Sequence, residues 1–200
     1  MKVLGLTGGI GMGKTTVARM LSRAGFPVFD SDATVHRLQG PGGAAVLPIG
    51  KLIPAALLKN AHGQLSLDRL ELRKAVMAHP DLIKQLEKII HPLVFAARDR
   101  FFKRCRRRGA DWVVIDVPLL FETGGEKHCD KVAVVSAPRR TQVARIARRR
   151  GMTPAEAQRM IARQMPDHEK RRRADVVIRT GLSMADTRRE VRALIREMRA

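Results

Sequence analysis

Apolar and polar residues follow two different spacings along this chain. Short runs that are apolar on both faces are typical of buried parallel strands, and they occupy residues 2–6, 27–32, 112–117, 131–136 and 174–178. Between these runs, apolar residues recur three or four positions apart, which predicts helices. Strands that alternate with helices predict an α/β fold with a parallel, doubly wound sheet flanked by helices.

Capping residues mark where several of these helices begin and end. Thr153 and Glu156 form a capping-box pattern, in which each side chain can satisfy an exposed N–H group of the first turn. Ser183 is the expected N-cap of the last helix. Gly25 and Gly151 are expected just past the ends of two others, because glycine readily adopts the conformation that terminates a helix.

A long stretch with mostly helical patterning, residues 33–110, separates the second predicted strand from the third. Its best helices cover residues 66–79 and 80–109, and Pro92 is expected to kink or restart the second, because proline has no N–H group to donate. The stretch is too long for an ordinary crossover. We therefore expect a helical subdomain over the carboxyl edge of the sheet, where ligands bind in α/β proteins.

Length and composition narrow the class of protein. A chain of 200 residues, 44% of them hydrophobic, suits one domain with a real core. No apolar run approaches the roughly 18 residues of a membrane span, and the first residues do not form a signal-peptide pattern. Cys105 and Cys129 lie in unrelated contexts, so we expect no disulfide framework and a reducing cytoplasm. The segment 128–130, His-Cys-Asp, lacks the second ligand pair of a zinc site.

The net charge of +20 is high for a globular domain. Residues 139–200 hold 18 Lys and Arg against 7 Asp and Glu, so +11 of the +20 lies there. Such a field suits either a nucleic-acid binder or an enzyme for polyanionic small molecules. Aromatic residues make up 4% of the chain and tyrosine is absent, which leaves little for stacking on bases. The arginines lie within amphipathic patterns and do not form a basic tail.

Residues 8–15, GGIGMGKT, match the phosphate-loop pattern G-x-x-x-x-G-K-[ST]. They follow a predicted strand and open a predicted helix, so backbone N–H groups and the helix dipole can surround a phosphate. Lys14 is expected to reach the β- and γ-phosphates, and Thr15 to ligate Mg²⁺. At Met12 we expect only the backbone N–H to act, so that almost any side chain could stand there and point away. The residues expected to hold the nucleotide phosphates are Gly8, Gly9, Ile10, Gly11, Met12, Gly13, Lys14, Thr15 and Thr16.

The phosphate loop alone leaves a kinase, a GTPase and an ATPase open. A guanine-reading T-K-x-D segment is absent, which argues against a GTPase. Asp30 and Asp32 flank Ser31 at the end of the second predicted strand. Two carboxylates at that place can bind Mg²⁺ through water and accept a proton from a substrate hydroxyl. The alternative is that they cap the helix that follows.

Several further segments keep the order and spacing of a known kinase family. They are GLTGGIGMGKTTVA, DSD, LEKIIHP, VVIDVPLLFE, QVARIARRRGMTPAEAQRMIARQM and ADVVI, which begin at residues 5, 30, 86, 113, 142 and 174. Together they resemble the dephospho-coenzyme A kinase family over nearly the whole chain. The phosphate loop is shared by many kinases, but the combination is specific.

The resemblance implies a P-loop NTPase fold of the nucleoside-monophosphate-kinase type. It implies a core of about residues 1–38, 110–138 and 174–200, a helical acceptor-binding insertion of about 39–109 and a lid of about 139–173. The implied reaction transfers the γ-phosphoryl group of ATP to the ribose 3′-hydroxyl of dephospho-CoA, the last step of coenzyme A synthesis. ATP and Mg²⁺ are the implied cofactors.

Residue roles also follow from the resemblance by position. Asp32 would be the general base, with Lys14, Arg145 and Arg148 as the other catalytic residues. Thr15 would ligate Mg²⁺, with Asp32 or Asp116 acting through water. Asp116 has the alternative of a buried strand-end carboxylate bonded to the phosphate loop, and His91 could cap a helix kink or contact the acceptor. The residues implied for acceptor binding are Asp32, His91, Pro118, Leu119 and Glu122.

Two departures from the family pattern stand out. The family usually has serine where this chain has Met12, and asparagine where it has Arg179, Thr180 and Gly181, a segment expected near the adenine. Two rival functions stay open: a nucleic-acid-binding module on a P-loop scaffold, and a kinase for another nucleoside or sugar. We expect a cytoplasmic monomer that acts on small molecules, with neither a membrane nor nucleic acid as partner.

Overall fold

The computed structural model describes the backbone of residues 1–200 and every side chain except that of Arg150. Two compact units make up the chain. The first contains Met1–Phe29 and Cys105–Ala200, and the second contains Asp30–Arg104. Each unit has its own cluster of buried apolar side chains.

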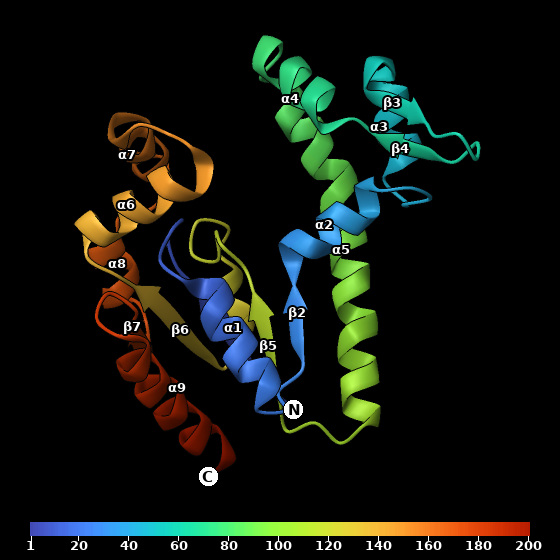
Figure 1. The fold of residues 1–200 in the computed structure, drawn as a ribbon. Coiled ribbons are helices and arrows are strands. Elements are labelled where there is room, and N and C mark those ends of the chain that lie inside the picture. Colours follow the sequence, from blue (N-terminus) through green and yellow to red (C-terminus); the bar gives the residue numbers. More distant parts are fainter. The chain divides into compact units, whose positions relative to one another are not determined.

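A five-stranded sheet with the strand order β2-β5-β1-β6-β7 organises the first unit (Figure 1). Its strands are β1 (Lys2–Thr7), β2 (Val28–Asp30), β5 (Trp112–Asp116), β6 (Lys131–Ser136) and β7 (Val176–Arg179). β1 runs parallel to β5 on one side and to β6 on the other, and β6 runs parallel to β7. The predicted α/β fold with a parallel sheet is confirmed.

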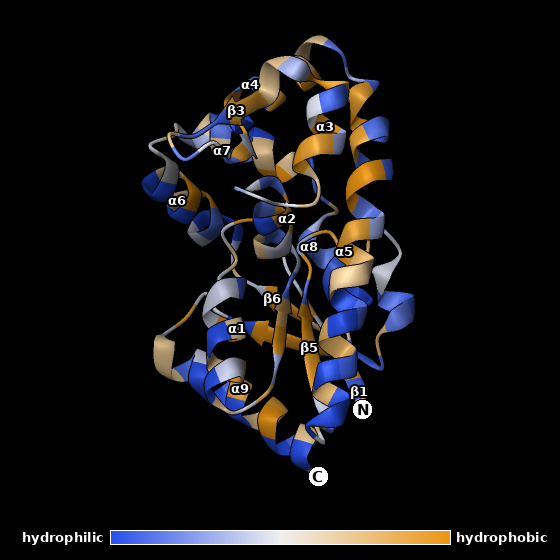
Figure 2. Cartoon of the chain, turned by 90° about the vertical axis from the view of Figure 1, so that its right-hand side faces the viewer, coloured by the Kyte–Doolittle hydropathy of each residue, from blue (hydrophilic) through white to orange (hydrophobic). Residues whose placement is uncertain are grey.

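The central strands are buried on both faces, as their continuous apolar runs predict. Leu4, Leu6, Val113, Val114 and Val134 have no exposed surface. Figure 2 shows these strands as hydrophobic ribbon beside helices with mixed surfaces. Because the strands are parallel, their carboxyl ends lie at one edge, and the loops that follow β1, β5, β6 and β7 meet there.

Two helices of the first unit pack on this sheet and on each other. They are α1 (Lys14–Arg23) and α9 (Met184–Arg199). Each contributes a buried apolar stripe to the core, including Leu21 from α1 and Leu194 from α9, while the charged positions face outward, as in an amphipathic helix. The predicted N-cap Ser183 is confirmed, and Asp186 completes a capping box with it.

Three further helices follow β6. They are α6 (Arg139–Arg150), α7 (Pro154–Ala162) and α8 (Asp167–Arg172). The capping box of Thr153 and Glu156 is confirmed at the start of α7, and Gly151 ends α6 with φ 61°, a conformation that favours glycine. A short 3₁₀ helix, η2 (Gly125–His128), precedes β6.

The second unit is mostly helical, but it also contains strands that the sequence patterns did not predict. Its helices are α2 (Ser31–Gln39), α3 (Val46–Leu52), η1 (Pro54–Ala56), α4 (Arg69–Ala78) and α5 (Leu82–Arg107), the last of which continues into the first unit. β3 (Leu57–Lys59) and β4 (Leu65–Leu67) form an antiparallel hairpin. α5 continues through Pro92 as one helix, so the expected restart there is wrong.

Leu194→Ala should lower the free energy of unfolding by about 2–5 kcal/mol, because it removes a side chain that is 2% exposed in the core between α9 and the sheet. Chemical denaturation would measure the loss. Leu182→Ala is the matched control, since Leu182 is 73% exposed and should change stability by less than about 0.5 kcal/mol. Equal losses in the two variants would contradict the burial of α9.

Candidate active site

The loop between β1 and α1 requires glycine where its neighbours leave no room for a side chain. Gly11 has φ +76°, and Gly13, the N-cap of α1, has φ +92°. Residues with a Cβ rarely adopt these conformations. A Cβ on Gly11 would also lie 2.8 Å from the side chain of Ile146. α6 therefore packs directly against the phosphate loop.

Four backbone N–H groups in the second half of the loop donate to no acceptor within the described residues. They belong to Gly11, Gly13, Lys14 and Thr15. The last two begin α1, so they also carry the positive end of its dipole. The arrangement is suited to binding an anion such as a phosphate. The N–H groups of Met12 and Thr16, by contrast, donate to Gly9 O at 3.1 Å and Gly13 O at 3.0 Å.

Lys14 forms an ion pair with Asp116, the last residue of β5. The Asp116 side chain is 6% exposed and that of Lys14 is 16% exposed. Asp116 is thus a buried strand-end carboxylate bonded to the phosphate loop, and its action on Mg²⁺ together with Thr15 stays a prediction. The pair holds the Lys14 ammonium beside the loop, where incoming phosphates would compete for it with the carboxylate.

The side chain of Met12 is part of the core, and the expectation that almost any residue could stand there is wrong. Met12 is 2% exposed and packs in the cluster that contains Leu4, Val17 and Leu21. Its sulfur accepts the N–H of Ala137 at 3.0 Å. The sequence predicted that the N–H of Met12 would serve a phosphate, but in this conformation that N–H donates to Gly9 O.

Thr180, at one of the departures from the family pattern, is bonded to the phosphate loop. Its hydroxyl donates to the carbonyl oxygen of Met12, and its N–H donates to Ser136 O at 2.8 Å. Arg145 of α6 donates to the carbonyl oxygen of Thr180 at 2.6 Å and to its hydroxyl at 3.1 Å. The two departures are therefore in contact, and Arg145 holds the segment that bears one of them.

Two glutamines bind the loop at Ile10. The side chain of Gln142, on α6, donates to Ile10 O at 2.7 Å, and that of Gln164, after α7, accepts from Ile10 N at 2.8 Å. The sequence motifs include both glutamines, but the residue patterns gave neither a role. Only the fold could reveal the contact, because both are more than 130 positions away from Ile10.

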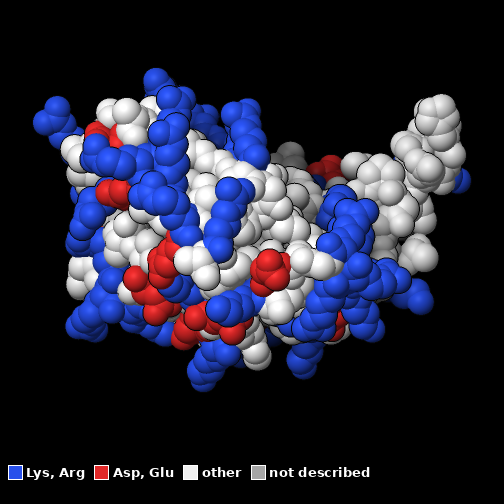
Figure 3. Space-filling model, turned by 90° about the horizontal axis from the view of Figure 1, so that it is seen from below, with Lys and Arg blue, Asp and Glu red and all other residues white. Residues whose placement is uncertain are grey.

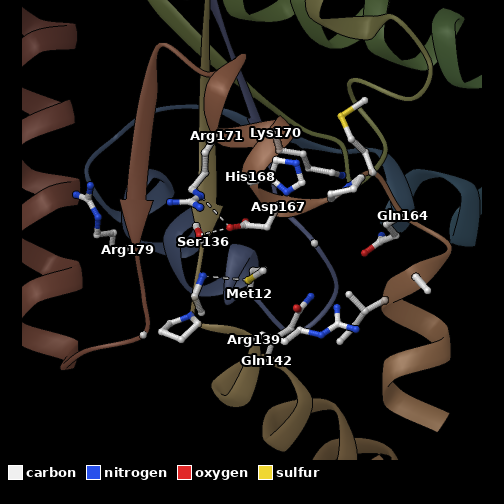
Figure 4. A pocket seen from close by; sticks show the side chains of 18 of the residues that line it. Met12, Ser136, Arg139, Gln142, Gln164, Asp167, His168, Lys170, Arg171 and Arg179 are labelled. Carbon is white, nitrogen blue, oxygen red and sulfur yellow. Dashed lines mark hydrogen bonds and ion pairs between the residues drawn. The ribbon is translucent and has the colours of Figure 1, made fainter. Parts of the chain in front are cut away.

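A cavity of about 700 Å³ opens beside the loop, wholly within the first unit (Figure 4). Gly9 and Met12 border it on the loop side, and the other lining residues come from the ends of β6 and β7, from α6 and from the segment through α8. In this cavity the Asp167 carboxylate accepts from Ser136 Oγ at 2.8 Å and pairs with Arg171 at 3.0 Å. The space is large enough for part of a nucleotide.

Comparisons with known proteins agree with this geometry. A family model described as dephospho-CoA kinase matches residues 2–186. The chain is 48% identical over 204 residues to a dephospho-CoA kinase of Gluconobacter oxydans, with 100% of this chain and 98% of the relative covered. It is 46% identical over 195 residues to one of Brucella melitensis, covering 98% of this chain and 94% of the relative.

The chain belongs to the dephospho-CoA kinase family. A solved dephospho-CoA kinase from Campylobacter jejuni has a similar structure, with a TM-score of 0.72, 26% identity and coverage of 98% of this chain and 96% of that one. A shikimate kinase from Bacteroides thetaiotaomicron, at 12% identity and a TM-score of 0.51, shares the fold over 100% of this chain and 99% of that one. The chain is thus a kinase with the fold of the P-loop kinases.

The family segment that follows β5 anchors the chain after α7. The Glu122 carboxylate, 23% exposed, pairs with Lys170 at 2.7 Å and accepts the N–H of Met165 at 3.1 Å. The Lys170 side chain has no exposed surface. Burial works to raise the pKa of Glu122, but its hydrogen bonds to Lys170 and to backbone N–H groups outweigh burial and lower that pKa. Glu122 is therefore a structural ion-pair partner here, and acceptor binding by it stays a prediction.

The other residues of the first unit that the resemblance assigns to acceptor binding or the lid differ in exposure and in hydrogen bonding. The Pro118 carbonyl oxygen accepts from Thr7 Oγ1 at 3.1 Å and from Lys170 at 3.5 Å. Leu119 is 42% exposed. On α6, Arg145 is half-buried and bonded to Thr180, whereas Arg148 is exposed.

The two carboxylates of the D-x-D segment have distinct places. Asp30 ends β2 and is the N-cap of α2, where its side chain accepts the N–H of Ala33 at 2.8 Å. Asp32 lies in the first turn of α2, so the expectation that it ends the strand is wrong. The capping role that sequence left open for Asp32 belongs to Asp30. Both residues belong to the second unit.

His91 is exposed on α5, with its ring centroid 6.1 Å from that of Phe95. Because α5 runs on through Pro92, His91 does not cap a break in the helix. Among the described side chains, no group of three or more His, Cys, Asp or Glu is placed to hold a metal ion. Within the same part of the chain, no helix is both long and apolar enough to cross a bilayer.

Glu122→Gln should cost about 3 kcal/mol of stability at pH 7, because it leaves the buried ammonium of Lys170 without its counter-charge. Since the pKa of Glu122 is lowered by folding, its contribution is complete above the ordinary glutamate value of about 4.3 and is lost as the pH falls through the lowered value. The free energy of unfolding should therefore fall less steeply below about pH 5 in the variant than in the parent.

Denaturant titrations at several pH values would measure both effects. The double variant Glu122→Gln with Lys170→Met should recover part of the loss, because no buried charge is left. A double variant that is as unstable as the sum of both single variants would show that the pair does not interact.

Proposed function

We propose that this chain transfers the γ-phosphoryl group of ATP to the ribose 3′-hydroxyl of dephospho-CoA, giving coenzyme A and ADP. The observation that carries the proposal is the set of open N–H groups at the start of α1 beside Lys14, in a chain of the dephospho-CoA kinase family. In the reaction the 3′-oxygen forms a bond to the γ-phosphorus. The bond from that phosphorus to the bridging oxygen breaks, and ADP leaves with its electron pair.

The phosphate loop supplies positioning and charge for this transfer. The open N–H groups would hold phosphate oxygens, and Lys14 would leave Asp116 for the β- and γ-phosphates. Arg145 and Arg148 are proposed to add positive charge as the lid closes over the transferred group. The cavity beside Met12 and the Arg179–Gly181 segment are proposed to take the base of ATP.

The residues of the loop suit a magnesium ion bound with ATP. Thr15 is exposed at the start of α1, and its hydroxyl is a hard oxygen ligand of the kind Mg²⁺ prefers. Thr15 would hold the ion together with the phosphates, and Asp116 or Asp32 would act through water. When bound, Mg²⁺ neutralises charge on the β- and γ-phosphates.

Asp32 is proposed as the general base that takes the proton of the 3′-hydroxyl. The support is chemical: Asp32 is a carboxylate of the family's D-x-D segment, and capping of α2 already occupies its neighbour Asp30. His91, Pro118, Leu119 and Glu122 are proposed to contribute to acceptor binding.

We also propose that the protein acts as a cytoplasmic monomer on small molecules. A nucleic-acid interface would gather basic side chains in one stripe or patch. Figure 3 instead shows Lys and Arg spread across the face in view. A few of them pair with an acidic residue of their own helix, as in the Arg189–Asp186 pair at 2.7 Å and the Arg171–Asp167 pair at 3.0 Å. We propose that most of the others lie on solvated helix surfaces.

An acceptor screen with ATP and Mg²⁺ tests the proposed reaction. ADP should form with dephospho-CoA and not with RNA, DNA, shikimate or other nucleosides, and phosphorus NMR should locate the new phosphate on the ribose 3′-oxygen. Lys14→Ala should lower kcat by at least about a hundredfold, because its charge no longer meets the phosphates, and it serves as the background control. Faster turnover with another acceptor would replace the proposed substrate.

Asp32→Asn should lower kcat by about 10²–10⁴ when the chemical step limits turnover at saturating Mg²⁺. The stability of α2 should hardly change, because Asp32 is not its cap. Asp30→Asn is the matched control: asparagine caps about as well as aspartate, so both stability and kcat should stay near those of the parent. An Asp32→Asn variant within tenfold of the parent rate would remove Asp32 as the base.

A further inference from the structure

Both backbone polar groups of one phosphate-loop residue, Ile10, are bonded by side chains from elsewhere in the first unit. Gln142 donates to the carbonyl oxygen of Ile10 at 2.7 Å, and Gln164 accepts from the N–H of Ile10 at 2.8 Å. The sense of each bond is fixed, because a carbonyl oxygen only accepts and an amide N–H only donates. Gln142 must therefore act as a donor and Gln164 as an acceptor.

The two amides lie closely against the loop. A Cβ added to Gly9 would be 3.1 Å from Gln142 Nε2 and 3.5 Å from Gln164 Oε1. Gln142 is 2% exposed, so water cannot readily replace the hydrogen bond of its amide. Both side chains also border the cavity beside the loop (Figure 4).

The backbone next to Gln164 is fixed by a separate interaction. The N–H of Met165 donates to the Glu122 carboxylate at 3.1 Å, and the same oxygen pairs with buried Lys170 at 2.7 Å. This anchor determines where Gln164 leaves the main chain. The backbone beside Gln164 is thus anchored, and this anchor helps to keep the Gln164 side chain in contact with Ile10.

We propose that Gln142 and Gln164 are positioning residues that clamp the two peptide units on either side of Ile10 and set the shape of the phosphate loop before ATP binds. Residues 8–11 contain three glycines, so an unclamped loop would sample many conformations and would lose that freedom on binding ATP. The clamp engages the N–H of Ile10 and leaves the open N–H groups of the second half of the loop for phosphate oxygens. Its catalytic consequence rests on the proposed ATP-dependent reaction.

Four variants distinguish the effect of hydrogen-bond direction from the effect of side-chain charge. Gln164→Glu keeps an acceptor for Ile10 N, whereas Gln164→Lys sets a donor against a donor. Gln142→Lys keeps a donor for Ile10 O, whereas Gln142→Glu sets an acceptor against an acceptor. At position 164 a charge effect and the clamp predict opposite orders of ATP affinity for the two variants. Lysine would attract ATP by its charge, but it would break the hydrogen bond to Ile10 N. The half-buried position 164 therefore decides between the two explanations.

Three measurements apply to each variant: direct binding of a fluorescent ATP analogue, steady-state kinetics with ATP and dephospho-CoA, and hydrogen exchange of residues 8–13 in the ligand-free protein. We expect Gln164→Lys to bind ATP about tenfold more weakly than Gln164→Glu, the loss expected for one unsatisfied buried group. KM for ATP should rise in the same proportion while kcat changes by less than about threefold. The loop should exchange about tenfold faster in Gln164→Lys.

Tighter ATP binding by Gln164→Lys than by Gln164→Glu would overturn the clamp in favour of a charge effect. Equal loss in both, with equal exchange rates, would reduce Gln164 to a packing role and would equally overturn it. The exchange and binding measurements need no acceptor turnover. A parent protein that binds ATP but does not phosphorylate dephospho-CoA would therefore contradict the proposed function. The binding and exchange data would still test the clamp.

Discussion

A loop can direct several backbone N–H groups at one anion only if its neighbours hold it from outside, and the first unit is organised around this requirement. A Cβ on Gly8 would lie 2.5 Å from Val135 O, one on Gly11 2.8 Å from Ile146, and one on Gly13 3.2 Å from Thr180. These contacts come from β6, from α6 and from the segment after β7. Three separate elements therefore pack closely against three glycines of the loop. The N–H groups of Gly11, Gly13, Lys14 and Thr15 are left without an acceptor in the described residues.

Motif residues that the resemblance assigns to magnesium or acceptor binding also stabilise this arrangement. Asp116 holds Lys14, and Glu122 holds both buried Lys170 and the N–H of Met165. Buried polar groups must find partners, and in this protein the partners are one another. A residue of a family motif can thus be needed for the geometry of a site whatever else it contacts, and Glu122 is the example here.

The sequence predicted local structure well and long-range contacts poorly. The five strands and the caps of α7 and α9 follow from apolar runs and from residues such as Thr153 and Ser183, which act over one helical turn. The β3–β4 hairpin escaped prediction because its strands have only three residues each. The division of roles between Asp30 and Asp32 depends on where β2 ends, and such boundaries shift by a residue or two.

The candidate site was predicted in the same uneven way. The phosphate loop is contiguous, and its pattern identifies it. Met12, Gln164 and Lys170 depend on partners 125, 154 and 48 positions away, for which the chain carries no local signal. The direction of the Met12 side chain is set by its packing against buried residues of β1 and α1. A pattern of residue types does not contain that information.

The contact between Met12 and Thr180 limits how related sequences can be interchanged. The methionine sulfur fills a core position beside Ala137, and the threonine hydroxyl ties the methionine carbonyl to Arg145. A smaller side chain at position 12 would leave part of this buried space unfilled, and a larger one at position 180 would crowd the carbonyl oxygen of Met12. A chimaera that exchanges the phosphate loop should therefore exchange the turn after β7 with it.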